Sequence, residues 1–298
     1  MLTTIKDLDM YILYYLDIYS ILQLSMITKS QHTLITNLDF IKELYILKSK
    51  DKKVRRKYKT KIYKTKINTL CKINKAAEHN CIALIIWIHE SIKEFKYNQK
   101  AINNASANGH VRILEWFSKS SYEFKYDEMA INRAAQKGYI DVLEWFRKSK
   151  YEFKYTNYAI NRASQQGHID VLEWFAVSDY EFKYSEDAID WAADRNYIHV
   201  LNWFSNSAYD FKYSNYAVYW ASENGYISIL DWFDKSPYEF KYTDCAIDNA
   251  ASNGHINVLE WFLKSKYKFI YTSYAIKSAQ RENHRHILDW FTANKKNI

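Results

Sequence analysis

The sequence predicts an all-α fold, a solenoid of eight 29-residue helical repeats with a small helical domain at its N-terminal end. Three observations predict this fold. Alanine recurs with a step of 29 residues from Ala76 to Ala279. All five glycines fall in a second column of the same period, where asparagine fills the other three places. Tryptophan recurs with the same step, at Trp87, Trp116, Trp145, Trp174, Trp203, Trp232, Trp261 and Trp290.

Each repeat opens with a residue suited to begin a helix. In the unit from Thr156 to Tyr184, Thr156 is the predicted N-cap, because its side-chain oxygen can accept from a free N–H of the first turn. Ala159, Ile160 and Ala163 then share one face of a short first helix. The equivalent N-cap column reads Asn98, Asp127, Thr156, Ser185, Ser214, Thr243 and Thr272.

The first helix is predicted to end at Gly167. Glycine and asparagine best tolerate the left-handed backbone conformation that ends a helix. We therefore expect a helix–turn–helix unit in every repeat. This column reads Asn80, Gly109, Gly138, Gly167, Asn196, Gly225, Gly254 and Asn283.

A second helix is predicted from Ile169 to Phe175, and it is apolar over so much of its circumference that neighbours must cover it on several sides. In Tyr180–Tyr184 apolar and polar residues alternate, which predicts an extended connector with its aromatic side chains directed inward. Such a unit cannot bury its own apolar faces, so each repeat depends on its neighbours. Arg285 replaces an aliphatic residue in the last repeat, as a more polar outer end requires.

The composition excludes several classes of protein. One proline and five glycines are too few for the turns of an all-β fold. Cys71, Cys81 and Cys245 are too few for a disulfide framework, which indicates a reducing compartment. Met1–Met10 lacks a signal-peptide pattern, and the longest apolar run, Cys81–Ile88, is too short to span a membrane. We therefore expect a soluble, intracellular protein.

The positive charge is concentrated in one segment. The net charge is +8, but the run from Lys48 to Lys66 holds eleven Lys or Arg and one acid, Asp51, so the rest of the chain is near −2. The predicted parts are a helical segment over 1–48, a basic connecting segment over 49–68 and the repeats over 69–298. The basic run can act as a nuclear-import signal, as a phosphate-binding patch or as a solvated linker.

The repeat unit resembles the ankyrin repeat. The family's Gly-His followed by aliphatic residues and Leu stands here as Gly109–Leu114, Gly167–Leu172 and Gly254–Leu259. Two departures are the 29-residue length, against about 33 in the family, and the missing Thr-Pro-Leu-His opening. We expect the family's long hairpin to be reduced to the short connector, which puts recognition through hairpin tips in doubt. The short repeat and its Leu-Glu-Trp-Phe signature are similar to ankyrin proteins of giant DNA viruses of amoebae (mimivirus-like), which implies a viral protein that acts in a host cell.

The N-terminal segment resembles an F-box. Ile12–Asp17 and Ile21–Ser30 are similar to the first two helices of that motif, and Phe40–Leu44 to its closing pattern, whereas Leu8-Asp9 stands in place of the family's Leu-Pro. The resemblance implies docking to a Skp-type linker subunit of a cullin ubiquitin ligase. The same apolar residues would serve equally well in a helical cap over the first repeat. The candidate docking residues are Ile12, Leu13, Leu16, Ile21 and Leu24.

Candidate partner-binding residues come from the variable position before the recurring alanine. Stacking is expected to align Arg133, Arg162, Trp191 and Trp220 in a strip along the first helices, with Tyr219 beside them. Trp, Tyr and Arg dominate the energetic hot spots of protein interfaces. The alternative is that the two tryptophans fill space between helices.

The sequence predicts no catalytic site, no metal site and no cofactor. Catalysis needs unlike groups in one pocket, whereas the histidines and acids here recur in columns. We interpret the histidines as structural and the acids before each tryptophan as a solvated or ion-paired stripe. The histidine column holds His110, His168, His255 and His284, and the acidic column holds Glu115, Glu144, Glu173, Asp231, Glu260 and Asp289.

The sequence therefore favours a non-enzymatic scaffold for protein–protein interactions, a monomer whose concave repeat face holds a protein partner. In its sharper form the chain recruits substrates to a cullin-type ubiquitin ligase through residues 1–48. The alternative is a nucleic-acid-binding or nucleus-targeted protein that acts through residues 48–66. We expect the protein in the host cytoplasm and not at a membrane. The basic segment could alternatively direct it to the nucleus.

Overall fold

The computed structural model describes residues 73–91 and 95–296, and all regular secondary structure in these ranges is helical. The predicted F-box-like segment and the basic segment lie outside the described residues. The chain forms two compact units. Unit 1 comprises Met1–Ala134 and Asp141–Lys154, and unit 2 comprises Ala135–Ile140 and Tyr155–Ile298. None of the described helices has the length and apolar character that crossing a lipid bilayer requires.

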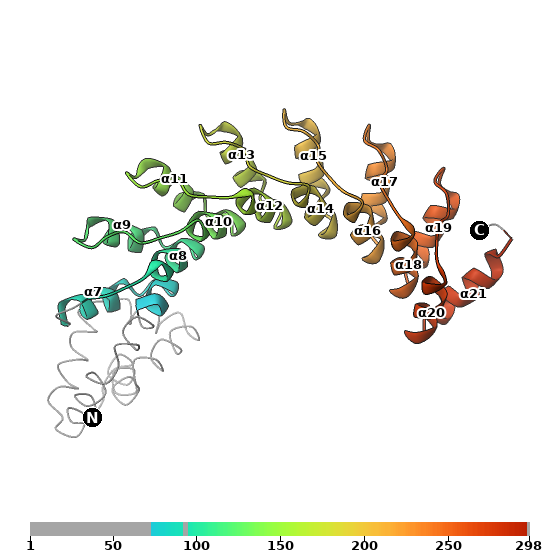
Figure 1. The fold of residues 1–298 in the computed structure, drawn as a ribbon, viewed down its shortest axis with the longest axis horizontal. Coiled ribbons are helices and arrows are strands. Elements are labelled where there is room, and N and C mark those ends of the chain that lie inside the picture. The colour runs from blue at the N-terminus through green and yellow to red at the C-terminus, as the bar shows by residue number, and fades with distance from the viewer. Residues whose placement is uncertain (1–72, 92–94, 297–298) are drawn as a thin grey trace, which may run out of the picture. The chain divides into compact units, whose positions relative to one another are not determined.

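The described helices alternate between a first and a second helix of each repeat (Figure 1). The first helices are α8 (Gln99–Ala107), α10 (Met129–Gln136), α12 (Asn157–Gln165), α14 (Asp187–Asp194), α16 (Tyr216–Glu223), α18 (Asp244–Ser252) and α20 (Ser273–Arg281). The second helices are α7 (Ile82–Ser91), α9 (Val111–Lys119), α11 (Ile140–Lys148), α13 (Ile169–Val177), α15 (Ile198–Asn206), α17 (Ile227–Lys235), α19 (Ile256–Lys264) and α21 (Arg285–Asn294).

Unit 2 has two layers. Its first helices pack serially from α12 through α14, α16 and α18 to α20, and its second helices pack serially from α13 to α21. Each first helix also packs against the second helix that follows it. Figure 1 shows these two rows side by side along unit 2. The serial packing of like helices is the arrangement of a helical-repeat solenoid, as the periodicity predicts.

The predicted N-caps are mostly confirmed. Asn98, Thr156 and Thr272 each accept a hydrogen bond from the backbone N–H two residues later. Asp127 accepts in the same way from the Met129 N–H, and Ser214 from the Tyr216 N–H.

Two members of the N-cap column are wrong as side-chain caps. Ser185 instead donates its hydroxyl to the Asp187 carboxylate at 3.0 Å, and Glu186 stands at the N-cap of α14. Thr243 precedes α18 without a side-chain capping bond. The carboxylate of Asp187 explains the first case, because it attracts the Ser185 hydroxyl away from the backbone.

The predicted turn is confirmed in every repeat. The eight glycine or asparagine residues of the column all have positive φ, from 56° at Asn80 to 79° at Gly254. After α12 the His168 N–H donates to the Ala163 carbonyl and the Gly167 N–H to the Ser164 carbonyl. This pair of bonds is a Schellman motif, which satisfies two carbonyls at the helix end.

The core lies between the two layers. The phenylalanine after each recurring tryptophan is fully buried in the second helices from Phe117 to Phe262. The paired small residues of the first helices, such as Ala192 and Ala193, are fully buried as well and allow adjacent helices to approach closely. The second helix of the Thr156 unit ends at Val177, two residues beyond the predicted Phe175. The tryptophans themselves are half-buried from Trp116 to Trp261.

The connectors join neighbouring repeats through aromatic stacking. Phe182 stacks on Tyr209 of the next connector with 4.0 Å between ring centroids, and on Trp203 of the next second helix at 5.6 Å. The Tyr184 hydroxyl donates to the Asp210 carbonyl at 2.5 Å. These interactions confirm an extended connector with its aromatic side chains turned inward, and they account for the 17% aromatic content.

Arg285 lies on the outer side of the last described repeat. Its side chain is 88% exposed and its Nε lies 3.8 Å from an Asp289 carboxylate oxygen. The equivalent Ile256 of the preceding repeat is only partly exposed.

Candidate binding face on the first helices

A continuous stripe of side chains on the first helices of unit 2 faces away from the core. Most of its members on one helix are three or four residues apart and so share one side of that helix, and Tyr219 is the immediate neighbour of Trp220. We name this stripe the first-helix face. It consists of Tyr158 and Arg162 on α12, Asp187, Trp191 and Asp194 on α14, Tyr216, Tyr219, Trp220 and Glu223 on α16, Cys245 and Asn249 on α18, and Tyr274 on α20, all of them half-buried or exposed.

Arg162 and Trp191 are in direct contact, as the predicted strip requires. The guanidinium carbon of Arg162 lies 4.3 Å from the centroid of the Trp191 ring and 4.8 Å from that of Tyr158. Arg162 also donates from Nη1 to the Gln165 side chain at 2.5 Å. The cation therefore contacts two aromatic rings from neighbouring repeats, which is a favourable cation–π arrangement.

Tyr216, Tyr219 and Trp220 form an aromatic cluster on α16. The rings of Tyr216 and Trp220 stack with 5.1 Å between centroids, and Tyr219 meets Tyr216 edge-on at 5.9 Å. Tyr216 is 53% exposed, one of the few large hydrophobic side chains so open to solvent in the described chain. Rigid aromatic side chains that present both an apolar ring and a polar group are typical anchors of protein interfaces.

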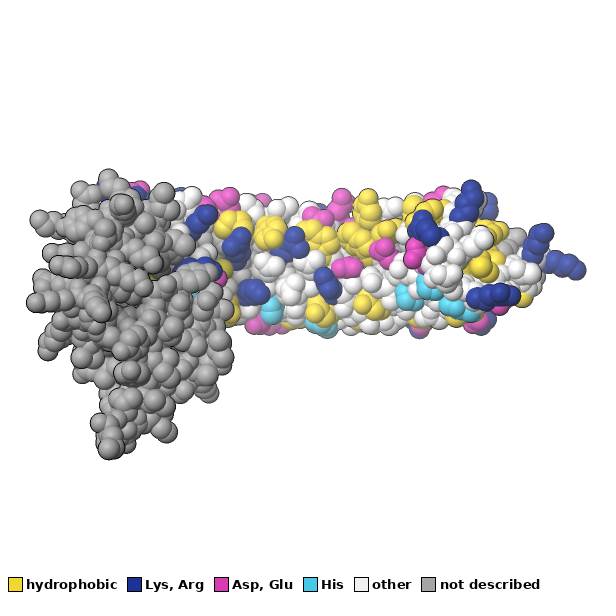
Figure 2. Space-filling view, turned by 90° about the horizontal axis from the view of Figure 1, so that it is seen from below, with side chains coloured by type: hydrophobic (Ala, Val, Ile, Leu, Met, Phe, Trp, Pro, Cys, Tyr) yellow, Lys and Arg dark blue, Asp and Glu magenta, His cyan; other side chains and the backbone are white. Residues whose placement is uncertain are grey.

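The middle of the first-helix face is acidic. The face itself carries Asp187, Asp194 and Glu223, Asp244 is partly exposed on α18, and the two remaining carboxylates of α14, α16 and α18, Asp190 and Asp248, are buried; these helices contain no Lys or Arg. Figure 2 views the molecule from the first-helix side, and hydrophobic side chains (yellow) lie there among carboxylates (magenta). The nearest cation along the chain, Arg195, lies just after α14, with its Nε 3.3 Å from an Asp194 oxygen.

Like charges act on one another across α14 and α16. Burial, and then the charge of Asp194, raise the pKa of Glu223. Burial, and then the charge of Glu223, raise the pKa of the Tyr219 hydroxyl. Both shifts have the sign expected for an excess of negative charge around partly desolvated groups.

A buried polar column joins α12, α14 and α18 of unit 2 to the repeat that follows each of them, and the sequence prediction did not include it. Asp190 accepts from both the backbone N–H and the hydroxyl of Ser214, at 3.0 and 2.5 Å. Asp248 accepts from Thr272 in the same way. Asn161 Nδ2 donates to the Ser185 hydroxyl at 2.6 Å and its Oδ1 accepts from the Ser185 N–H. We name this contact the inter-repeat bond.

Tyr219 occupies the position of this column in α16. The inter-repeat bond that Asp190 makes to Ser214 is therefore missing between Tyr219 and Thr243, consistent with the uncapped Thr243. Asn or Asp stands five residues after the N-cap position in five of seven repeats, and this repetition could have revealed the column from the sequence, with Tyr219 and Lys277 as its exceptions. The predicted binding residues also have neighbours three or four positions away on the same helix, and this spacing could have added those neighbours to the predicted strip. They are Tyr158, Tyr216, Asp194 and Glu223.

Arg133 is exposed on α10, in unit 1. In unit 2 the predicted strip begins at Arg162, which contacts Trp191, and Tyr219 lies beside Trp220 with 6.3 Å between ring centroids. Trp191 and Trp220 are half-buried on adjacent helices. The predicted docking residues Ile12, Leu13, Leu16, Ile21 and Leu24 lie outside the described residues.

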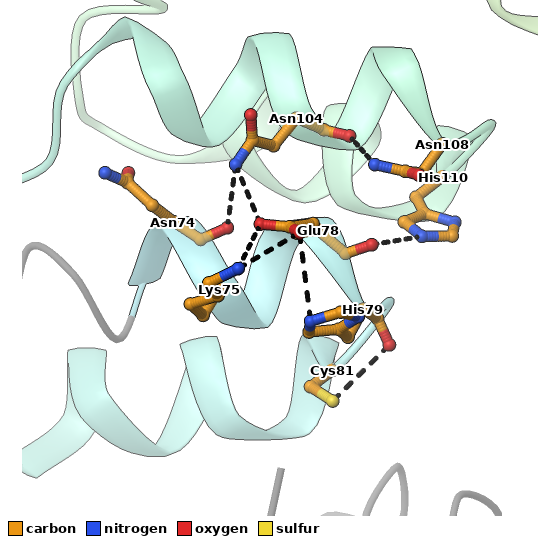
Figure 3. Close-up of polar contacts among 8 residues, drawn as sticks. All are labelled: Asn74, Lys75, Glu78, His79, Cys81, Asn104, Asn108 and His110. Atoms are coloured by element: carbon orange, nitrogen blue, oxygen red, sulfur yellow. Dashed lines mark hydrogen bonds and ion pairs between the residues drawn. The ribbon is translucent and has the colours of Figure 1, made fainter. Parts of the chain in front are cut away.

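The position before the recurring alanine, which holds Arg162, Trp191 and Trp220 in unit 2, has a different role in unit 1. Lys75 pairs with Glu78 at 3.0 Å, and Asn104 Nδ2 donates to the Asn74 carbonyl and to Glu78 at 3.4 Å (Figure 3). His110 Nε2 lies 3.0 Å from the Glu78 carbonyl oxygen, which links the same two repeats. Polar residues of this column thus join repeats in unit 1, whereas aromatic residues fill it on α14 and α16.

The recurring histidines and acids have structural contacts. A Cβ added at Gly225 would lie 2.8 Å from His255 Nδ1, so this imidazole packs directly on the glycine of the preceding repeat. Glu144 pairs with Arg147 at 2.8 Å, and Asp231 accepts from the indole N–H of Trp261 at 2.7 Å. Within the described ranges no three His, Cys, Asp or Glu side chains are grouped as metal ligands.

The described cavities are shallow grooves beside the second helices. One, of about 370 Å³, is lined by Trp232 and Lys235 of α17 together with Asn202 of α15. A similar groove of about 410 Å³ in unit 1 is lined by Trp145, Lys148 and Tyr151. Equivalent positions line both grooves, so they arise from the stacking of repeats. No family model matches the chain, and no curated protein matches it either.

Proposed function

We propose that the chain is a scaffold for protein–protein interactions and that the first-helix face of unit 2 holds a protein partner. The observation that carries the proposal is the aromatic cluster on α16, where Tyr216 is 53% exposed and stacks on Trp220. Solvent-exposed, mutually rigid aromatic rings lose little side-chain entropy when a partner covers them. Arg162 and Trp191 extend the same kind of surface onto α12 and α14.

We propose further that the repeats are of ankyrin type, eight in number over residues 69–298, and that the chain belongs with the ankyrin proteins of giant viruses. Support comes from the two-helix unit, the positive φ of the turn column and the serial packing of like helices in unit 2. The 29-residue period in the sequence supports the number of repeats.

Tagged chain expressed in amoebal cells and analysed by affinity purification with mass spectrometry tests the scaffold function. The double variant Trp191→Ala/Trp220→Ala is expected to recover at least tenfold less partner protein, because removal of each ring weakens the interface by about 1–3 kcal/mol. Val177→Ala is the matched control, since Val177 is 85% exposed at the end of α13, away from the first-helix face.

Far-UV circular dichroism must show that the double variant keeps its helices. Unchanged capture by a folded double variant would contradict a binding role for this face. Loss of helical signal in the variant would instead assign Trp191 and Trp220 to the core.

The sharper form of the proposal makes the chain a substrate-recruiting adaptor of a cullin-type ubiquitin ligase. Its support is the similarity of residues 1–48 to an F-box, with Ile12, Leu13, Leu16, Ile21 and Leu24 as docking residues. Deleting residues 1–48 should remove Skp and cullin subunits from the purified material while proteins bound to the repeats stay. Recovery of neither subunit with the full chain would leave the scaffold without a ligase role.

The alternative function is a nucleic-acid-binding or nucleus-targeted protein. The observation that favours it is the run from Lys48 to Lys66, with eleven Lys or Arg and one acid. Deleting 48–66 should then abolish a salt-sensitive shift of DNA or RNA, or nuclear accumulation of a fluorescent fusion. A shift that survives this deletion would rule out the basic patch.

A further inference from the structure

We propose that the partner segment held by the first-helix face is cationic, an Arg- or Lys-bearing stretch of a protein whose charged side chain lies over Trp220 between Asp194 and Glu223. The inference rests on the proposed scaffold function and adds the chemistry of the partner. Four observations on unit 2 support it.

The charge distribution of the first-helix face favours a ligand of positive charge. Helices α14, α16 and α18 contain no Lys or Arg, and four of their six carboxylates, Asp187, Asp194, Glu223 and Asp244, are partly exposed, whereas Asp190 and Asp248 are buried. Cations border this region, Arg162 on α12 and Lys277 and Arg281 on α20. A negatively charged ligand, nucleic acid included, is repelled from the middle of such a surface, whereas a cationic segment is attracted to it.

The carboxylates at the centre lack sufficient countercharge. Glu223 makes no ion pair in the described chain, and its pKa is raised by burial and by the charge of Asp194. Asp194 receives Arg195 at 3.3 Å and the Asn224 side-chain amide at 3.2 Å, both from the rim of the face. A guanidinium or ammonium group placed between the two carboxylates would relieve their mutual repulsion.

The face already shows how it can hold a guanidinium group. The guanidinium carbon of Arg162 lies 4.3 Å from the centroid of the Trp191 ring and 4.8 Å from that of the Tyr158 ring. One repeat further on, Trp220 has the position of Trp191 and Asp187 the position of Tyr158, while Tyr216 of the same helix stacks on the Trp220 ring with 5.1 Å between centroids. No Lys or Arg lies over Trp220 among the described residues. An arginine of the partner over Trp220 would make the same kind of cation–π contact, beside two carboxylates.

The fourth observation is the departure at Tyr219. The inter-repeat bond at this position is made by Asn161, Asp190 and Asp248, whereas Tyr219 does not form it. A net hydrogen bond of this kind stabilises by about 1 kcal/mol. Local rules of a fold are broken mainly where function requires it. The replacement adds an aromatic ring next to Trp220 and Glu223, at the place where the cation would bind.

The test uses the full chain and two fluorescein-labelled probes, the peptide (Gly-Arg)₄ and its uncharged citrulline counterpart (Gly-citrulline)₄. Fluorescence anisotropy should give at least tenfold tighter binding of the arginine peptide, weakening as salt rises. Trp220→Ala and Glu223→Gln should each weaken it about three- to thirtyfold, the range of a cation–π contact or one charge pair. Glu173→Gln on α13 is the matched control and should have no effect.

Cys245 reports where the peptide binds. It is exposed on the first-helix face, whereas Cys81 is buried, with its pKa raised to about 12 by that burial. In a Cys71→Ser background, the arginine peptide should slow alkylation of Cys245 by a maleimide, and the citrulline peptide should not. If the arginine peptide binds but does not slow alkylation of Cys245, the cation binds elsewhere and the inference is overturned. The same holds if Trp220→Ala and Glu223→Gln leave the affinity of the peptide unchanged.

Two further outcomes are decisive. If Trp191→Ala/Trp220→Ala abolishes partner capture from cells but the two peptides bind alike, the scaffold function holds and the cationic partner is wrong. The basic run of this chain, Lys48–Lys66, is another possible occupant. If the arginine peptide binds only after the Lys and Arg of that run are replaced by Ser, the chain itself occupies the face and the inference of an external cationic partner is overturned.

Discussion

Asp190 shows how a single buried carboxylate can serve the repeat and weaken it at once. Its side chain is 2% exposed and accepts two hydrogen bonds from Ser214. Burial outweighs these bonds and raises the pKa of Asp190 to about 6. At neutral pH the folded protein therefore keeps a charge in a place that disfavours it, whereas the unfolded chain ionises this group freely above about 4.

Asp190→Asn is expected to stabilise the protein by about 1–2 kcal/mol at pH 7. Asn161 makes the equivalent inter-repeat bond without a charge. Because the folded pKa of Asp190 is raised, the wild type gains stability as pH falls from about 6 to about 4, and the variant lacks this gain.

Urea denaturation followed by circular dichroism at pH 7, 6, 5 and 4 measures the difference between the two proteins. The advantage of Asp190→Asn should shrink steadily toward pH 4. The pKa of His255, which burial lowers, affects both proteins equally and cancels in the difference. A difference that stays constant over this range would show that Asp190 does not titrate as inferred.

Gly225 illustrates the backbone requirement of the turn. Its φ is +74°, and an added Cβ would lie 2.8 Å from His255 Nδ1. Gly225→Ala is therefore expected to lower the free energy of unfolding by about 2 kcal/mol, from left-handed strain and displacement of the imidazole.

Asn283→Gly is the matched control, because Asn283 has φ 61° at the same position of its repeat. It should be neutral or stabilising by up to about 1 kcal/mol, since glycine adopts this conformation without strain. Thermal melts of both variants measure the effects. Equal losses in the two variants would show that the positive φ is not what the column requires.

At the scale of the helix pair, α16 and α18 lack the inter-repeat bond that joins the other described pairs of first helices in unit 2. The reason is Tyr219, which replaces Asn or Asp and points to a conflict between stability and function at this junction. The junction retains the packing of Ala217 and Ala221 and the aromatic stacking of the connectors, so the repeat stays folded without the bond.

Tyr219→Asn is expected to restore the bond to Thr243 and raise the free energy of unfolding by about 1 kcal/mol. The same change should weaken binding of the arginine peptide several-fold, because the ring next to Trp220 is lost. Chemical denaturation and anisotropy measure the two effects on one variant. A variant that is less stable and binds as before would mean that Tyr219 is a packing residue.

Tyr219→Phe separates the ring from the hydroxyl. It keeps the aromatic surface and cannot form the inter-repeat bond, so its stability should match the wild type and peptide binding should be largely retained.

At the scale of each unit, stability is shared between neighbours. The phenylalanine column, the aromatic connectors and the inter-repeat bonds all join one repeat to the next, so a local defect propagates to adjacent repeats rather than to the whole chain. The first-helix face uses positions that these contacts leave open. The column that holds Trp191 and Trp220 contains Asn104, Arg133, Arg162 and Asn249 in other repeats, so the same repeat unit accommodates different side chains at this position.

The sequence by itself determined the repeat period, the alternation of two helices and the left-handed turns, because these depend on local backbone preferences and on hydrophobic spacing that every repeat restates. The column from Asn80 to Asn283 is the clearest case, since only glycine or asparagine suits its positive φ. The sequence also marked Arg162, Trp191, Tyr219 and Trp220 as unusual members of their columns.

Only the tertiary structure decided which side chains of different repeats meet. The stacking of Arg162 on Trp191, the bond from Ser214 to Asp190 and the mutual influence of Asp194 and Glu223 join residues about one repeat apart. Such contacts depend on the rise and rotation between stacked repeats, which no single repeat encodes locally. Burial, which raises the pKa of Asp190, is likewise a property of the stack, because it requires the neighbouring repeat to be in place.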